Sequence, residues 1–402
     1  MRTELGSLTS LRFFAALAIV VHHCNGVFWP AKNLGPLDAG VSFFFVLSGF
    51  ILTYAHSGMP AGAASRWAFY RARLVRIFPL HLLTLALTMV LVDVPEPFDA
   101  RVLAANALLL HAWIPLDRYF FSYNYVSWSI STELFFYLLF PFLLHTGRAR
   151  LRACFFGTLL LVAALAVASY LGHLPSWQTT HDHLSATGLL YTNPLARLAE
   201  FVLGMLAARV YLRRCQAAPV IAGSAPWSLR WTLAELAAVL MFGLAYAYLL
   251  SSFAPVIHQA MLSAGATTIG LAGAAEEMAR LSALSPAAAM VVDEWANHVG
   301  MTPFAVLLIY VFARQRGVLS RLLSLTLLRR LGEISFALYL VHQIVLRLFQ
   351  QHGASAGALN FSLYLLLCLL SATALFHLVE QPARRFLRRA RLPHNASGKI
   401  AA

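Results

Sequence analysis

Charged residues are scarce in this chain of 402 residues: Asp, Glu, Lys and Arg make up only 11% of it, whereas 60% of its residues are hydrophobic. A soluble globular protein has about 25% charged residues. Lysine is almost absent, since only Lys32 and Lys399 occur among the 30 basic residues. This composition argues against a soluble enzyme. The net charge of +14 is better explained by basic cytoplasmic loops than by a nucleic-acid partner.

Cysteine is also rare, and its spacing excludes two kinds of site. The four cysteines (Cys24, Cys154, Cys215 and Cys368) are scattered through or beside apolar segments. Neither a disulfide framework nor a metal-ligand pattern is visible, so no metal is expected. No small-residue cleavage site follows the first apolar run. We therefore expect a retained first helix and not a signal peptide.

What the chain does have is long apolar segments. A membrane-spanning helix needs about 17 to 25 residues, and ten segments meet this requirement. They are residues 8–25, 37–56, 75–92, 126–145, 152–173, 194–211, 231–252, 299–314, 333–351 and 360–380. Two more stretches, 102–114 and 258–275, are weaker or amphipathic. The predicted fold class is an all-α polytopic membrane protein with about ten transmembrane helices.

The arginines predict how these helices are oriented. Arginine-rich segments follow every second span, including "TGRARLR" at 146–152, while most acidic residues fall in the segments between. The positive-inside rule then places both termini in the cytoplasm. Promoting 102–114 alone to a span would put "TGRARLR" outside. We therefore expect the two weak stretches to be re-entrant or interfacial helices on the outer side, where segments 93–125 and 253–298 could cap a cavity.

The first candidate site is "LTSLRFFAALAIVVHHC", residues 8–24. Arg12 and His23 are eleven residues apart, which on a helix is about 20° in rotation and about 16 Å in length. His22 would lie about 80° away from Arg12, so His23 is the better partner on its face. The alternative is that Arg12 reaches the cytoplasmic interface and His23 packs in the core.

Ionisable residues recur in three further apolar segments. In "FYRARLVRIFPLHLL", Arg73 and Arg76 share one helix face and could clamp phosphates, unless they are only positive-inside flanks. "YVSWSISTELFFYLLFP" places Glu133 within a span, and an intramembrane carboxylate suggests a functional site. Glu133 could equally be a structural partner of a buried cation. His342, in "ISFALYLVHQIVL", is a weaker candidate, because a lone helical histidine is more often a core residue.

Taken in order, these segments resemble the acyltransferase 3 family of membrane acyltransferases. The resemblance extends over essentially the whole chain. Its further parts are "GVSFFFVLSGFIL" in the second span, "IFP" after the arginine pair, "SWSISTELFFY" around Glu133, and "EQPARR" from Glu380. Many members have Asp where this chain has Ser42, so any role of that acid is not carried over.

The resemblance implies the activity and the site. Members transfer acyl groups, usually acetyl from acetyl-CoA, to sugars or other acceptors, and many modify cell-envelope polysaccharides. It implies His23 and Glu133 as catalytic residues, and Arg73, Arg76 and Arg12 as donor-binding residues. Ser48, Tyr137 and His342 are secondary candidates.

From the resemblance we also expect one acyltransferase domain over residues 1–380 and a basic cytoplasmic tail over 381–402, similar to the stand-alone members. The expected location is the bacterial cytoplasmic membrane. The partners would be acyl-CoA, a sugar or polysaccharide acceptor and membrane lipid, and a homo-oligomer is left open.

In the expected mechanism, the CoA phosphates stay at the cytoplasmic arginines while the pantetheine arm reaches the outer half of the membrane. There His23 would take the proton of the acceptor hydroxyl, with Glu133 hydrogen-bonded to its other nitrogen. His23 could instead carry the acyl group as a covalent intermediate. The main alternative to an enzyme is a transporter or lipid flippase, since ionisable residues also line transport paths. Against it, no matching pair of Gly/Pro-broken helices is evident in the two halves.

Overall fold

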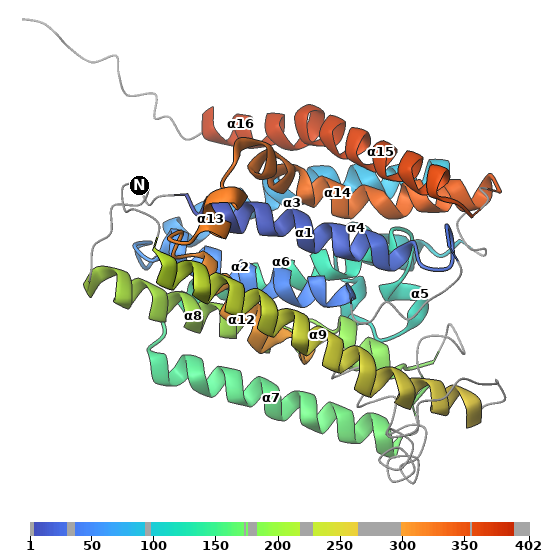
Figure 1. Ribbon diagram of the computed structural model, residues 1–402. Helices are drawn as coiled ribbons and strands as arrows, with labels where there is room; N and C mark the ends of the chain where they lie inside the picture. Colours follow the sequence, from blue (N-terminus) through green and yellow to red (C-terminus); the bar gives the residue numbers. More distant parts are fainter. Residues whose placement is uncertain are drawn as a thin grey trace, which may run out of the picture.

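The computed structural model describes residues 4–29, 37–92, 98–172, 174–175, 183–217, 228–263, 299–353 and 356–389. Within these ranges the chain is a bundle of helices without strands; a single isolated bridge joins Leu116 and Leu184. Figure 1 shows the long helices running in one general direction, with α7 at one edge of the bundle and α15 near the opposite edge.

The long helices are α1 (Gly6–His23), α2 (Gly40–His56), α3 (Ala63–Leu91), α6 (Trp128–His145), α7 (Arg148–Leu171), α8 (Leu198–Ala217), α9 (Leu229–Ser263), α12 (Thr302–Phe312), α14 (Thr326–Gln351) and α15 (Ala358–Leu375). The shorter ones are η1 (Leu37–Ala39), α4 (Ala100–Ala107), η2 (His111–Trp113), α5 (Asp117–Phe120), η3 (Tyr125–Ser127), η4 (Gly188–Thr192), α13 (Val318–Leu323), η5 (Phe376–Glu380) and α16 (Gln381–Arg389).

Each of the ten predicted spans has a helix at its place, and the all-α membrane class is confirmed. In the described ranges, eight helices are long and apolar enough to cross a membrane. The two predicted spans that are not among the eight are those of α8 and α12. Helix α8 carries several charged residues and α12 has only 11 residues. The number of ten spans and the cytoplasmic position of the termini stay predictions.

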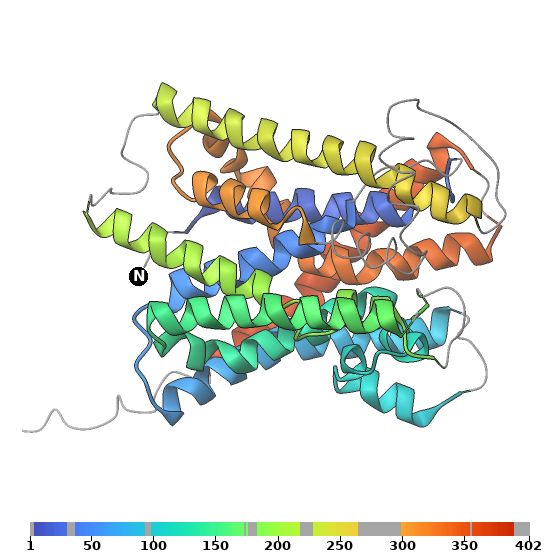
Figure 2. The ribbon, with the colours of Figure 1, turned by 90° about the horizontal axis from the view of Figure 1, so that it is seen from below.

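The predicted outer segments are described in part. Residues 102–114 form α4 and η2, which are too short to span a bilayer. With α5 they lie at the end of the bundle opposite the N-terminus in both ribbon views (Figures 1 and 2). Of 258–275 and 253–298, most residues lie outside the described ranges. In the predicted tail, α16 is described and packs against α3.

Close backbone contacts hold the core helices together. A Cβ atom added to Gly49 of α2 would lie 2.0 Å from the carbonyl oxygen of Phe201 in α8, and one added to Gly204 would lie 2.0 Å from that of Val46. Gly332 of α14 meets the carbonyl of Thr9 in α1 in the same way, at 1.9 Å. Small residues of this kind let membrane helices approach closely. Close packing matters in lipid, because the hydrophobic effect does not drive helices together there.

The periphery is apolar, as a lipid-facing surface must be. Large apolar side chains are exposed along the outer helices, including Leu160 of α7 (73% exposed), Leu240 of α9 (61%) and Leu370 of α15 (57%). Helices α3 and α15 each begin after a glycine with a positive φ, +138° at Gly62 and +154° at Gly357, which other residues rarely adopt. The buried faces of α1, α2, α3, α6 and α14 enclose the site described next.

Candidate active site

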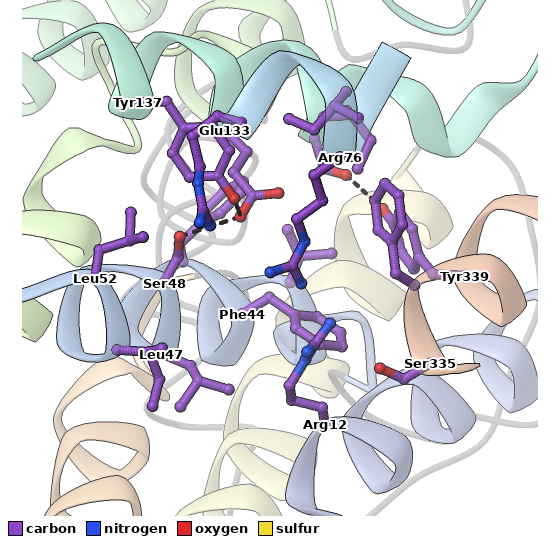
Figure 3. A pocket seen from close by; sticks show the side chains of 18 residues that line it. Arg12, Phe44, Leu47, Ser48, Leu52, Arg76, Glu133, Tyr137, Ser335 and Tyr339 are labelled. Carbon is purple, nitrogen blue, oxygen red and sulfur yellow. Dashed lines mark hydrogen bonds between the residues drawn. The ribbon is translucent and has the colours of Figure 1, made fainter. Parts of the chain in front are cut away.

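A pocket opens between α1, α2, α3, α6 and α14, with about 850 Å³ of empty space including its opening (Figure 3). One wall is apolar. The lining residues are Arg12, Val41, Phe44, Phe45, Leu47, Ser48, Ile51, Leu52, Arg73, Arg76, Ile77, Ser129, Ile130, Glu133, Tyr137, Ser335, Phe336 and Tyr339. Six of the eight residues predicted for the site are therefore brought together here: Arg12, Arg73, Arg76, Glu133, Ser48 and Tyr137.

The arginines dominate the electrostatics of the pocket. Arg12 of α1 and Arg76 of α3 point toward each other across it (Figure 3) and interact as like charges. Within the described ranges none of Arg12, Arg73 and Arg76 has a carboxylate oxygen within 4.0 Å. Three formal positive charges and one negative, from Glu133, give the lining a net charge of +2. Half-buried cations without direct partners favour an anionic ligand.

Helix α3 positions its two arginines by spacing and packing. Arg73 and Arg76 are three residues apart and so share one face of the helix. The Arg73 guanidinium lies over two aromatic rings, 5.5 Å from the centre of Phe69 and 5.7 Å from that of Tyr137. Pro79 follows within α3 and cannot donate a backbone hydrogen bond, which loosens the helix just beyond the pair.

Glu133 is bound within the same pocket by hydroxyl groups. Its Oε1 accepts hydrogen bonds from Ser48 of α2 at 3.1 Å and from Tyr137, one turn further along α6, at 2.5 Å (Figure 3). Glu133 also interacts electrostatically with all three pocket arginines. It thus fixes Tyr137 and partly balances the arginine charge.

His23 lies at the end of α1 and pairs with His342 of α14. The His23 Nδ1 is 2.9 Å from the carbonyl oxygen of Ile19 and 3.2 Å from Nε2 of His342. The Nδ1 of His342 is 2.7 Å from the carbonyl of Tyr339. A carbonyl only accepts, so each Nδ1 carries the proton, and the single Nδ1 proton of His23 is shared between the Ile19 carbonyl and His342 Nε2. This tautomer leaves a lone pair on the Nε2 of His23.

The predicted contact between His23 and Glu133 is wrong. The described hydrogen bonds of Glu133 come from Ser48 and Tyr137, and those of His23 involve Ile19 and His342. The physical reason is position along the helices, because Glu133 sits level with Ser48, well inside α2, whereas His23 ends α1. His342, which was a weaker candidate, is the residue that orients His23.

Tyr339 connects the arginine pocket with the histidine pair. Its ring lines the pocket, its hydroxyl is 2.7 Å from Ser129 Oγ, and its carbonyl accepts the hydrogen bond from His342. The rings of Tyr339 and His342 have their centres 5.9 Å apart. Tyr339 therefore contacts both the pocket and the histidine pair of His23 and His342.

The outer segment is tied to α14 next to the histidines. Asn124 donates to the carbonyl of Leu340 at 2.9 Å, and Arg347 donates to the carbonyl of Tyr123 at 2.8 Å. His111 of η2 lies within hydrogen-bond distance of Ser127 Oγ, at 3.1 Å. Burial lowers the pKa of His111 to about 3, so this histidine is neutral and structural.

The sequence reasoning missed a buried ion pair beside the pocket. Arg197 and Glu200 are both fully buried and 2.9 Å apart, and Arg197 also donates to Ser42 at 2.8 Å. Its guanidinium lies 5.3 Å from the ring centre of Phe45, which lines the pocket. Two opposite charges three residues apart in the apolar stretch "LARLAEFVL" were the signal that could have revealed the pair.

Comparisons with known proteins find acyltransferases over almost the whole chain. A family model described as "Acyltransferase domain" matches residues 5–377. The acyltransferase MdmB of Streptomyces mycarofaciens is 29% identical, with 96% of this chain and 94% of that protein covered. The O-acetyltransferase OatA of Staphylococcus aureus is 30% identical over 36% of this chain and 26% of its own length. No solved structure matches.

Proposed function

This chain belongs to the acyltransferase 3 family, and from that membership we propose that it moves an acyl group from cytoplasmic acyl-CoA to a hydroxyl group of an acceptor outside the cytoplasm. The observation that carries the proposal is the pocket in which Arg12, Arg73 and Arg76 face one cavity, with no direct carboxylate partner among the residues that the structure describes. Acetyl is the proposed acyl group, supported by the name of the Staphylococcus relative.

The arginine pocket suits the phosphates of CoA. A guanidinium can bind phosphate oxygens by paired hydrogen bonds, and each charge-assisted bond contributes about 1.5–3 kcal/mol. CoA adds negative charge where the lining has an excess of positive charge. In the predicted topology the arginine end of the bundle is the cytoplasmic one, where the donor is found.

The distance between the arginines and His23 suits the flexible arm of the donor. Eleven helical residues separate Arg12 from His23, or about 16 Å at 1.5 Å per residue. A pantetheine arm running past Tyr339 would bring the thioester towards the histidine pair. The acyl group would then be in reach of an acceptor arriving from the outer side, while the nucleotide stays at the inner side.

The histidine pair supplies the base. The Nε2 of His23 takes the proton of the acceptor hydroxyl as its oxygen forms a bond to the thioester carbon. The C–S bond breaks, and the CoA sulfur leaves with the proton that His23 returns. His342, through Nε2, holds the His23 Nδ1 proton and so fixes the reactive tautomer. In the alternative route His23 first takes the acyl group on Nε2 and then passes it to the acceptor.

Glu133 receives a different role from the one expected. Because its oxygen accepts from Ser48 and Tyr137 and faces the arginines, we propose it as a positioning residue of the donor pocket. The acceptor is proposed as a cell-surface polysaccharide or a lipid-linked sugar, reached from the outer leaflet of the bacterial cytoplasmic membrane.

The test uses the purified protein with acetyl-labelled acetyl-CoA. Without an added acceptor, water takes its place, and the slow hydrolysis of acetyl-CoA is measured. His23→Ala is expected to lower the rate at least a hundredfold. His22→Ala, the neighbouring histidine on another face of α1, is the matched control and should keep most of the activity. A wild-type protein that does not consume acetyl-CoA, or a fully active His23→Ala variant, would refute the proposal.

A further inference from the structure

Beside the arginine pocket lies a second charged group, the ion pair of Glu380 and Arg384. It belongs to the segment "EQPARR", which the donor pocket does not use. The two side chains are directly paired, with Glu380 fully buried and Arg384 35% exposed. The other carboxylate oxygen of Glu380, Oε2, is buried without a hydrogen-bond partner in the described structure. A half-satisfied buried carboxylate is costly, so its position needs a reason.

The local backbone explains how the pair reaches the pocket. Pro382, in the first turn of α16, has no N–H group, and its ring crowds the carbonyl one turn before it. Immediately before α16 the chain widens into the π-helix η5, a distortion frequent at functional sites. Both η5 and α16 pack against α3, the helix that carries Arg73 and Arg76. The Arg384 guanidinium lies 6.0 Å from the ring centre of Phe376.

The pair is part of the same charge network as the pocket. Glu380 interacts electrostatically with Arg12 and Arg76. Arg384 interacts with Arg76 and Arg73, and with Arg12. Helix α16 lies at the end of the bundle where the N-terminus is found (Figure 1), which is the predicted cytoplasmic end. Arg384 is thus a fourth guanidinium within electrostatic range of the three pocket arginines, and it is partly open to solvent.

Resting on the proposed function, we propose that Arg384 recognises the phosphate monoester at the nucleotide end of the donor, and that Glu380 holds this arginine in place near the pocket arginines. An acyl-CoA carries a pyrophosphate within its chain and a separate 3′-phosphate on its ribose. The three pocket arginines match the pyrophosphate, and the partly exposed guanidinium of Arg384 matches the terminal dianion. The planar fork of arginine binds two phosphate oxygens at once.

The competing explanation is that the pair only fastens α16 to the bundle. Arg385 separates the two explanations, because it is the next residue on the same helix. Its side chain is exposed and donates to Gln381 at 3.0 Å, away from the pocket network. Arg384→Gln and Arg385→Gln therefore remove the same charge from the same short helix, and only the first removes the proposed phosphate contact.

The experiment is calorimetric titration of the full-length protein in detergent with CoA and with 3′-dephospho-CoA. The wild type is expected to bind CoA at least tenfold more tightly than 3′-dephospho-CoA, which is the effect of one charge-assisted contact. In Arg384→Gln this preference disappears because CoA affinity falls to the level of dephospho-CoA. Arg385→Gln keeps the preference, and Arg384→Lys keeps part of it. Unchanged binding of dephospho-CoA by Arg384→Gln shows that the variant is folded.

Three outcomes would overturn the inference. Equal affinity of the wild type for both ligands would mean that no group reads the 3′-phosphate. If Arg384→Gln still preferred CoA over dephospho-CoA, another residue would recognise the 3′-phosphate. If the variant lost affinity for both ligands equally, the role of Arg384 would be structural. In each of these cases the proposed donor still binds the wild type. Failure of the wild type to bind either ligand would instead refute the proposed function and this inference together.

Discussion

The environment of Arg12, Arg73 and Arg76 decides what the pocket can bind. Each guanidinium lies in a membrane-embedded bundle without a direct carboxylate partner in the described structure. Charge in such a place is expensive and usually faces a polar cavity. A phosphate-bearing ligand would supply the missing negative charge, whereas an uncharged ligand would not offset the free-energy cost of burying the three guanidinium groups.

Replacing either Arg73 or Arg76 by alanine should weaken CoA binding about ten- to a hundredfold, because each removes a charge-assisted contact worth about 1.5–3 kcal/mol. Lysine should restore only part of the affinity, since it lacks the planar fork. Calorimetric titration of each variant with CoA measures this. Arg150→Ala, at an exposed position in the first turn of α7, is the control and should bind like the wild type. Unchanged affinity in both pocket variants would make the pair ordinary flanking charges.

His342 should act on turnover through His23. We expect His342→Ala to lower kcat about ten- to a hundredfold with little change of KM for acetyl-CoA, because the donor phosphates bind elsewhere. His342→Gln, whose side-chain oxygen can accept the His23 Nδ1 hydrogen bond, should recover part of the loss. Steady-state kinetics with labelled acetyl-CoA decides this. A change of KM alone, or no rescue by glutamine, would contradict an orienting role.

At the level of helices, apolar length predicted much of what is found. Every predicted span has a helix, because the backbone N–H and C=O groups of an apolar segment in lipid must form hydrogen bonds within the segment itself. The span at 194–211 was predicted from its apolar length, but the pairing of Arg197 with Glu200 beside and within α8 was not. The pairing of α2 with α8 could not be predicted, because single glycines such as Gly49 and Gly204 give no periodic signal.

The contact of α2 with α8 gives a prediction about stability. Gly49→Ala would place a Cβ 2.0 Å from the backbone oxygen of Phe201, so the helices must separate. Overpacking of this kind costs about 1–3 kcal/mol. We expect a clear fall in the unfolding temperature of the detergent-solubilised protein. Gly157→Ala in α7, where a Cβ meets nothing within 4 Å, is the matched control. Equal unfolding temperatures for the two variants would mean that the contact is looser than described.

Helix phase and depth order residues along one helix, but the expected partners were wrong where helices from distant parts of the chain meet. Arg12, Arg73, Arg76 and Glu133 do line one pocket. The predicted partner of His23 was wrong, because His23 and His342 are 319 positions apart and meet only through the packing of α1 on α14. Sequence spacing orders residues along one helix and does not order the helices around a cavity.

At the level of the whole molecule, the proposed function requires that donor and acceptor reach the protein from opposite sides of the membrane. The arginine pocket is proposed to take the donor from the end of the bundle that holds the N-terminus. Helix α14, which carries His342, is tied to Tyr123 and Asn124, and the preceding α4, η2 and α5 lie at the opposite end of the bundle (Figure 2). Tyr339 lines the pocket with its ring and holds His342 with its carbonyl. The acyl group, and not the whole donor, would pass along this route.

The most direct test is to measure from which side of the membrane the protein consumes acetyl-CoA. Acetyl-CoA is highly charged and does not cross a lipid bilayer. Sealed inside-out and right-side-out membrane vesicles containing the protein are given external labelled acetyl-CoA, and the release of free CoA is measured, with His23→Ala vesicles as background. Only the inside-out vesicles should consume the donor, and the right-side-out vesicles should do so once they are permeabilised. Equal consumption by sealed right-side-out vesicles would contradict donor entry from the cytoplasmic arginine pocket.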